Sequence, residues 1–276
     1  AARRGENFTD KPVQELTRKC SRPSEALWKA TRNIASMELI DIKGVRLEVQ
    51  RIEGAAHTTT SPLVFLHEGL GSVAMWRGRE GSWPQALCTA TGRSGIVYSR
   101  QGYGQSDPVP DVRGAGRLKP DYMHREAWDV LPALLNALGV SQPPVLVGHS
   151  DGASIALLHA SRYPVQACVV MAPHVMVEDI SIQSIEQARL AFESAGLRER
   201  LARYHAAVDV AFWQWNDAWL SPAFRSFDIR GDCRRITAPV LAIQGLDDAY
   251  GTMRQIEEIA PTLGPLQLLA IAQCGH

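Results

Sequence analysis

Short apolar runs alternate with amphipathic stretches over most of the chain after residue 36. Residues 37–42 and 45–51 alternate on either side of Lys43-Gly44 and predict a β-hairpin. Residues 121–138 repeat apolar side chains at helical spacing and stop at Gly139. Continuous apolar runs, typical of buried parallel strands, lie at 63–66, 95–99, 143–147, 168–172, 239–244 and 266–271. The alternation predicts an α/β fold with a doubly wound, mostly parallel sheet covered on both faces.

The strand-helix alternation stops between residues 173 and 239. Three helices are predicted in succession, at 180–195, 197–205 and 208–220, with no strand between them. We therefore expect a helical cap, residues 174–238, inserted into a core of residues 37–173 and 239–276. Residues 1–36 carry eight Lys or Arg against four Asp or Glu and little apolar periodicity, so we expect a mobile leader there.

One junction between a strand and a helix carries the clearest chemical signal. The apolar run 143–147 leads into Gly148-His149-Ser150-Asp151-Gly152, and a helix-forming run follows. G-x-S-x-G in this setting is the nucleophile elbow, a tight turn that lifts the serine hydroxyl above the sheet edge. Ser150 is therefore the predicted nucleophile, and the alternative is an ordinary glycine turn.

A serine nucleophile needs a base, and the base needs an orienting acid. Strand 239–244 leads to Asp247 and Asp248, and strand 266–271 leads to His276. Open parallel sheets place their sites just beyond the carboxyl ends of strands. His276 is therefore the predicted base, with one of the two aspartates as the acid.

The order serine, acid, histidine resembles the α/β-hydrolase family, over residue 37 to the chain end. The turns Gly245 to Asp248 and Gly275-His276 are similar to the family's G-x-x-D and G-H, which implies Asp248 rather than Asp247 as the acid. The elbow serine disfavours epoxide hydrolases and haloalkane dehalogenases, which use aspartate there. The implied reaction is ester hydrolysis through an acyl-enzyme, with no metal ion or cofactor.

The oxyanion hole needs two preorganised backbone donors. The amide of Asp151 is one. Residues 67–72, HEGLGS, resemble the family's H-G-x-x-G-S loop, which implies the Gly69 amide as the other. Glu68 and Asp151 depart from the family pattern, and we expect their carboxylates to flank the pocket and favour a cationic substrate. For Glu68 the alternative is pairing with Arg77, Arg79 or Arg100.

Aromatic side chains near these motifs are candidates for the walls of a substrate pocket. Trp76 follows the oxyanion loop, His174 lies beyond a strand end, and Trp213 belongs to a tryptophan-rich predicted cap helix. We predict that these three contact substrate. The alternative for the cap tryptophans is packing within the cap core.

Composition fits a globular enzyme. The chain has 276 residues, 45% hydrophobic content and a formal net charge of zero, which gives no electrostatic reason to expect nucleic acid or membrane as a partner. No apolar run approaches the ~20 residues of a membrane span, and no signal-peptide pattern is present. Five cysteines without C-x-x-C spacing favour reduced thiols. We expect a cytoplasmic protein with a small-molecule ester or lactone substrate; the sequence does not set the oligomeric state.

Three segments refine the expected substrate. HEGLGS, YSRQGYGQS and GHSDGASIAL are together similar to serine-dependent macrolide esterases, which open the macrolactone ring of amino-sugar antibiotics and confer resistance. The resemblance implies the same reaction here. Two alternatives stay open: a general carboxylesterase or carbon–carbon bond hydrolase of small catabolites, and a hydrolase-like binding protein without turnover.

Overall fold

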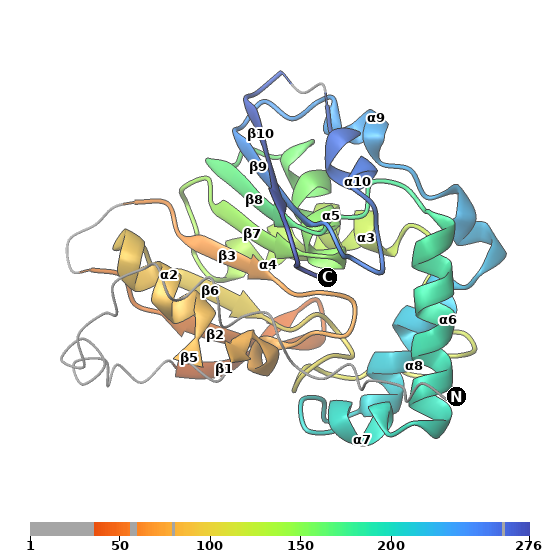
Figure 1. Cartoon of the computed structure of the whole chain (residues 1–276). Helices are drawn as coiled ribbons and strands as arrows, with labels where there is room; N and C mark the ends of the chain where they lie inside the picture. Colours follow the sequence, from red (N-terminus) through yellow and green to blue (C-terminus); the bar gives the residue numbers. More distant parts are fainter. Residues whose placement is uncertain (1–35, 56–59, 79–80, 261–262) are drawn as a thin grey trace. The chain divides into compact units, whose positions relative to one another are not determined.

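The computed structural model describes residues 36–55, 60–78, 81–260 and 263–276 (Figure 1). The predicted leader, apart from Ser36, lies outside the described residues. The strands are β1 (Ser36–Ile42), β2 (Val45–Ile52), β3 (Leu63–Leu66), β4 (Arg77–Gly78), β5 (Gly81–Ser82), β6 (Gly95–Tyr98), β7 (Val145–His149), β8 (Ala167–Met171), β9 (Val240–Gly245) and β10 (Leu266–Ile271). The helices are α2 (Trp83–Thr91), α3 (Tyr122–Arg125), α4 (Leu131–Ala137), α5 (Asp151–Ala160), α6 (Asp179–Ser194), α7 (Leu197–Leu201), α8 (Val208–Trp219), α9 (Arg230–Cys233) and α10 (Arg254–Glu257), with 3₁₀ turns Val73–Trp76 and Pro222–Ser226.

Eight strands form one sheet in the order β1-β2-β6-β3-β7-β8-β9-β10. The β2 strand pairs antiparallel with β1 and β6, and all other pairs are parallel. The predicted doubly wound, mostly parallel sheet is confirmed. The register aligns Leu66 with Gly148, His149 with Met171, and Gly245 with Ile271. The carboxyl ends of β3, β7, β8, β9 and β10 therefore share one edge of the sheet.

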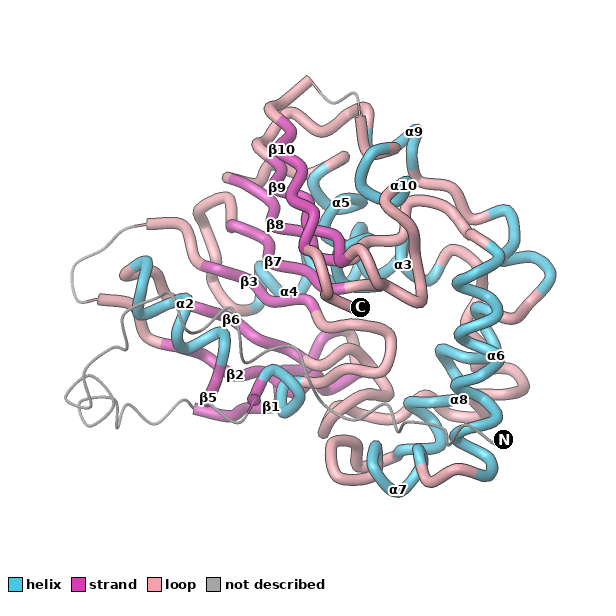
Figure 2. The backbone as a smooth tube through the Cα atoms, viewed as in Figure 1, coloured by secondary structure: helices cyan, strands magenta, loops and turns pink. Residues whose placement is uncertain are grey.

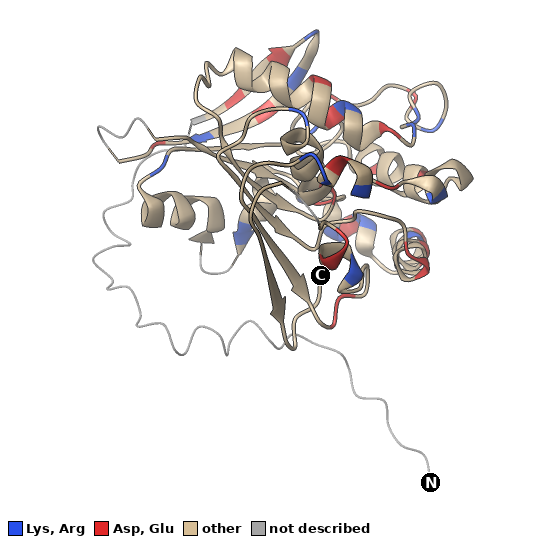
Figure 3. Cartoon of the chain, turned by 90° about the horizontal axis from the view of Figure 1, so that it is seen from above, with Lys and Arg blue, Asp and Glu red and all other residues tan. Residues whose placement is uncertain are grey.

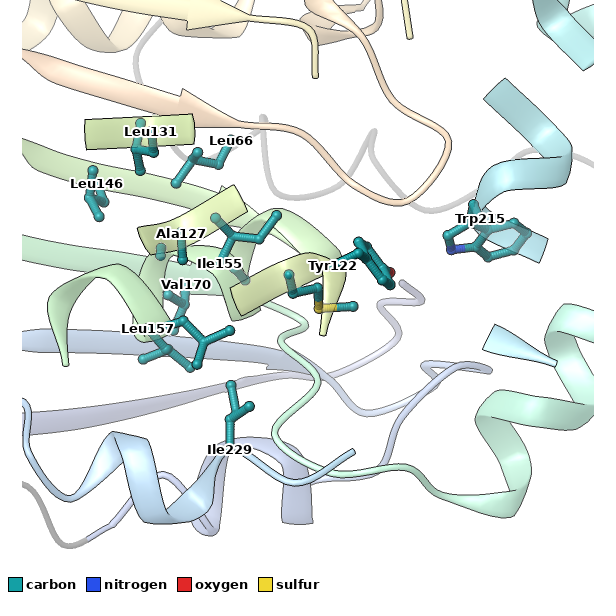
Figure 4. Packing of buried hydrophobic residues seen from close by; sticks show 14 of the residues in the cluster. Leu66, Tyr122, Ala127, Leu131, Leu146, Ile155, Leu157, Val170, Trp215 and Ile229 are labelled. Atoms are coloured by element: carbon teal, nitrogen blue, oxygen red, sulfur yellow. The ribbon is translucent and has the colours of Figure 1, made fainter. Parts of the chain in front are cut away.

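Two apolar clusters lie on the two faces of this sheet. The larger one packs α3, α4 and α5 against strands β3, β6 and β7, and Figure 4 shows Leu66, Leu131, Leu146 and Ile155 side by side within it. The smaller one places Cys88 of α2 against Phe65 and neighbouring strand residues. The expected cover on both faces fails at the β10 end, where four consecutive residues of the strand are exposed in the described part of the chain.

The helix predicted at 121–138 forms as one continuous element with a π turn, Glu126–Val130, between α3 and α4. Pro132 explains the irregularity, because its ring crowds the carbonyl of Trp128 and proline has no N–H to bond it. The hydroxyl of Tyr163 donates to that Trp128 carbonyl at 2.8 Å instead. A proline inside the helix is therefore tolerated through a side-chain donor.

The three helices predicted between residues 173 and 239 form as α6, α7 and α8, which stand beside the carboxyl edge of the sheet (Figure 2). The α7 helix ends four residues before the expected end at His205. The reason is that His205 bonds two core loops: its Nδ1 accepts from the Gly104 N–H at 3.0 Å, and its Nε2 donates to the Leu70 carbonyl at 2.9 Å.

Charged residues lie mainly on helices and loops, while most of the sheet carries other residues (Figure 3). No helix among the described residues is both long and apolar enough to cross a membrane.

Candidate active site

Ser150 stands at the turn between β7 and α5 in a strained backbone conformation. Its φ is 53° and its ψ is −120°, outside the regions that residues with a Cβ ordinarily occupy. Its backbone N–H donates to the Met171 carbonyl at 2.9 Å, which ties the turn to β8. This is the geometry of a nucleophile elbow, with the serine at the carboxyl edge of the sheet.

Two glycines allow this turn to pack closely. A Cβ on Gly152 would overlap the carbonyl of Leu66 at the end of β3, and one on Gly148 would overlap the carbonyl of Gly152. Both obstacles are backbone atoms, which cannot rotate away. The start of α5 can therefore approach β3 this closely only with glycine at 152, and β7 only with glycine at 148.

His276 and Asp248 form a close pair. The His276 Nδ1 lies 2.9 and 3.0 Å from the two carboxylate oxygens of Asp248. Asp248 also accepts from the Tyr250 N–H at 2.7 Å and from Gln244 Nε2 at 2.7 Å. Burial opposes ionisation of Asp248, but the bond from His276 and the other donors outweigh it and lower the carboxyl pKa below its ordinary value.

The neighbouring Asp247 is exposed, and its backbone N–H donates to the Cys274 carbonyl at 2.9 Å. Because His276 bonds Asp248 through Nδ1, its Nε2 is left for the proton of Ser150. Ser150 and His276 line the same pocket. No hydrogen bond joins Ser150 Oγ to His276 among the described residues. Such bonds are often long in unliganded enzymes and tighten with substrate.

Hydrogen bonds from His67 and Arg100 hold the loop after β3. His67 Nδ1 donates to the Glu68 carbonyl at 2.7 Å, and its Nε2 accepts from the Arg100 N–H at 3.1 Å. The buried Arg100 guanidinium donates to the carbonyls of His67 and Glu68 at 2.7 and 3.1 Å. In the described part of the chain, the N–H groups of Gly69 and Asp151 have no acceptor. Two such amides at one pocket are candidates for the donors of an oxyanion hole.

The side chain of Asp151 turns away from the pocket, contrary to the expected acidic flank. It accepts from the Tyr122 hydroxyl at 2.5 Å and from Trp219 Nε1 at 3.3 Å, and Arg100 lies 3.9 Å away. Burial raises the pKa of this carboxyl. The Asp151 carboxylate is therefore the counter-ion of the buried Arg100 and does not face the pocket.

The carboxylate of Glu68 stays at the pocket and has a different partner from those expected. Its Oε2 lies 3.7 Å from Nδ1 of His149, whereas Arg100 contacts only its backbone. Arg79 lies outside the described residues. Burial opposes the charge on Glu68, yet the imidazoles of His149 and His67 outweigh it and lower the carboxyl pKa to about 2.

The pocket lies between the elbow and the cap. It encloses about 110 Å³ and brings Ser150, His276, Gly69 and Glu68 together with Ile185, Trp215 and Trp219 of the cap. Figure 4 shows Trp215 apart from the sheet core, on the side of the cap. A Cβ on Gly69 would overlap the Trp215 indole, so the cap rests directly on the oxyanion loop.

Of the three predicted wall residues, only His174 lines this pocket. Trp76 lies in the smaller core cluster instead, against Phe65 and stacked on Trp83, because the 3₁₀ turn that carries it packs on the other face of the sheet. Trp213 lies under the guanidinium of Arg113, 3.8 Å from its ring centre.

Residues 63–276 match the alpha/beta hydrolase family. The chain belongs to this family. A search of curated proteins found no match.

Three solved structures share the hydrolase fold. A carboxylesterase structure from the ammonia-oxidizing thaumarchaeon Nitrososphaera gargenis is 18% identical over 87% of this chain and 91% of that chain, with a TM-score of 0.63. Est816, described as an N-acyl homoserine lactone degrading enzyme, is 21% identical over 87% and 93%, with a TM-score of 0.61. The enol-lactonase from Burkholderia xenovorans LB400 is 19% identical over 86% and 91%, with a TM-score of 0.60. At these identities the likeness shows the fold alone.

Two cap tryptophans of this hydrolase pocket were not selected from the sequence. Trp215 and Trp219 stand four positions apart, so they share one face of α8 with the buried Phe212, while Trp213 points elsewhere. The helical repeat could have distinguished Trp215 and Trp219 from Trp213. His149, the residue before the nucleophile, was also overlooked, although its place at the end of β7 puts it beside Glu68.

The larger cavity of the hydrolase, about 520 Å³, lies at the opposite end of the sheet, where Gly95 begins β6 and Leu138 follows α4. Parallel sheets bind their ligands beyond the carboxyl ends of strands, whereas this cavity opens at the amino ends. The smaller pocket at Ser150 is therefore the candidate site.

Proposed function

We propose that this α/β hydrolase is a serine-dependent esterase that cleaves carboxylic esters or lactones through an acyl-enzyme. The observation that carries the proposal is the arrangement at one pocket of a strained Ser150, a His276 bonded to Asp248, and the amides of Gly69 and Asp151, for which the described residues offer no acceptor. These are the nucleophile, base, acid and oxyanion donors that acyl transfer requires.

The reaction follows from these positions. Nε2 of His276 takes the Ser150 proton as the serine oxygen attacks the carbonyl carbon, and the amides of Gly69 and Asp151 stabilise the resulting oxyanion. The imidazolium then donates its proton to the leaving alcohol oxygen, which stays attached to the acyl chain when the substrate is a lactone. A water molecule, deprotonated by His276, attacks the acyl-enzyme and releases the acid. Asp248 holds the tautomer with the proton on Nδ1 throughout.

A fluorophosphonate probe tests the nucleophile and separates an esterase from a binding protein. Labelling is expected on Ser150 of the wild type and is expected to disappear in Ser150→Ala. Because triad residues act as a unit, Ser150→Ala should also lower kcat on a p-nitrophenyl ester by about 10⁴- to 10⁶-fold. Retention of more than about a tenth of the activity would refute this assignment.

For the substrate, we propose the lactone ring of macrolide antibiotics, on the resemblance of the three motif segments. Drug-sized ligands occupy pockets of about 300–1,000 Å³. Admission of a macrolactone into a pocket of about 110 Å³ therefore requires α6 and α8 to move outward. The pocket as it stands favours the second candidate, hydrolysis of small carboxylic esters or lactones.

A substrate panel distinguishes the two candidates. Macrolide antibiotics with rings of different size, small lactones and short p-nitrophenyl esters are incubated with the wild type and with Ser150→Ala. Ring opening is read as the mass gain of one water. A Ser150-dependent gain on the antibiotics supports macrolide esterase activity, whereas turnover confined to the small esters supports the second candidate.

A further inference from the structure

Among the described residues, His174 brings to the pocket an imidazole whose Nδ1 has no hydrogen-bond partner. Its side chain is 2% exposed, and no described residue bonds its Nδ1. Burial, followed by the nearby His276, lowers the His174 pKa to about 3, so the ring is uncharged at neutral pH. Buried polar atoms in proteins are nearly always paired, so an unpaired nitrogen in the wall of this pocket needs an explanation.

The fold nevertheless holds this ring in place. The backbone N–H of His174 donates to Ser154 Oγ at 2.9 Å, and the same hydroxyl donates to the His174 carbonyl at 2.7 Å. Ser154 lies one turn along α5 from Ser150. The ring packs edge-on against Trp219, with centres 4.8 Å apart, and lies 5.8 Å from the ring centre of His276.

Two other buried histidines differ in this respect. His67 uses one ring nitrogen for the Glu68 carbonyl and the other for the Arg100 N–H. His205 uses both nitrogens to join core loops. These bonds explain why His67 and His205 are buried. No bond of this kind among the described residues explains the burial of His174 Nδ1.

Resting on the proposed ester hydrolysis, we propose that His174 binds a hydroxyl group that the substrate carries close to its scissile ester group. A neutral imidazole offers one N–H and one lone pair, so it can donate to the hydroxyl oxygen or accept from its O–H. The neighbouring walls, Trp219, Trp215 and Ile185, fit the carbon skeleton around that oxygen. His174 is thus a specificity residue of the site.

Four matched esters test this proposal: ethyl butyrate, the two enantiomers of ethyl 3-hydroxybutyrate, and 2-hydroxyethyl butyrate. They share the reacting carbonyl and differ in whether a hydroxyl is present on the acyl side or the alcohol side. The wild type is expected to prefer one hydroxylated ester over ethyl butyrate by about 5- to 100-fold in kcat/KM, the effect of satisfying a buried polar atom. The side of the preferred hydroxyl then identifies the subsite.

His174→Phe is expected to abolish this preference while ethyl butyrate is still hydrolysed, and His174→Gln, which keeps hydrogen-bonding atoms, is expected to retain part of it. The control is Ile185→Leu, an apolar wall substitution that should change all the esters by a similar factor. Equal wild-type rates on every ester would overturn the proposal without any variant having to fold. So would an equal loss on all esters in His174→Phe. Absence of hydrolysis of any ester would instead refute the proposed function.

Discussion

Replacing Asp248 by Asn tests the acid of the catalytic site with almost no change in shape. The two carboxylate oxygens accept from His276 Nδ1, the Tyr250 N–H and Gln244 Nε2. An amide has one oxygen and an NH₂ group, so it cannot accept from all three. The backbone donor of Tyr250 is fixed and retains the oxygen at the Oδ1 position, which leaves the NH₂ at the Oδ2 position, the nearer of the two to His276 Nδ1. An imidazole that accepts from this NH₂ at Nδ1 carries its proton on Nε2.

A histidine in that tautomer cannot take the proton of Ser150. The same exchange in a serine protease triad costs about 10⁴ in kcat, or about 5.5 kcal/mol of transition-state stabilisation. We expect a fall of that order for Asp248→Asn, with KM changed by less than about threefold, in steady-state assays on a p-nitrophenyl ester. The matched control, Asp247→Asn, changes an exposed side chain and should cost less than about tenfold. The reverse ranking would move the acid to Asp247, and two equally small effects would refute this account of the triad.

Three further outcomes are expected. Gly69→Ala should lower kcat by about 10²- to 10³-fold, because the new methyl overlaps Trp215 and displaces an oxyanion donor, and adding Trp215→Ala should restore part of the rate. Glu68→Gln should raise KM for amino-sugar lactones in a salt-sensitive way and leave neutral esters nearly unchanged; an equal change for both would make Glu68, with its partner His149, a structural residue. In urea titrations, the free energy of unfolding should fall as the pH drops from about 6.5 towards 3. In this range His174 binds a proton in the unfolded chain but not in the folded one, where it is buried. His174→Phe should therefore remove about 1.4 kcal/mol per pH unit of this slope.

The sheet could be predicted because its strands are short apolar runs separated by helices, so both their positions and their parallel pairing follow from the pattern. The α2 helix was missed, since only Pro84 and Cys88 of its side chains are fully buried and its apolar periodicity is weak. The π turn near Pro132 was also beyond the pattern. It depends on the Tyr163 hydroxyl, which reaches the helix from another part of the chain.

The candidate site could be predicted in outline for a related reason. Ser150, Asp248 and His276 each follow a strand, and parallel register brings strand ends to one edge whatever the intervening loops do. Side-chain direction does not follow from that rule. The carboxylate of Asp151 was expected at the pocket, but it points into the core. There it contacts Arg100 and Tyr122, which lie far from it in the sequence.

The contacts between cap and oxyanion loop connect substrate size to catalysis. Trp215 rests on Gly69, and His205 bonds the carbonyl of Leu70 next to it. If the cap moves outward to admit a large ring, these contacts either break or draw the loop along, and the donor at Gly69 is disturbed in both cases. A small ester needs no such movement. A large lactone is compatible with an intact oxyanion hole only if its bulk lies outside the pocket and just the atoms around the ester group pass beneath Trp215. The selectivity of this hydrolase should therefore be decided by the few atoms nearest the scissile bond, where His174 and Glu68 lie.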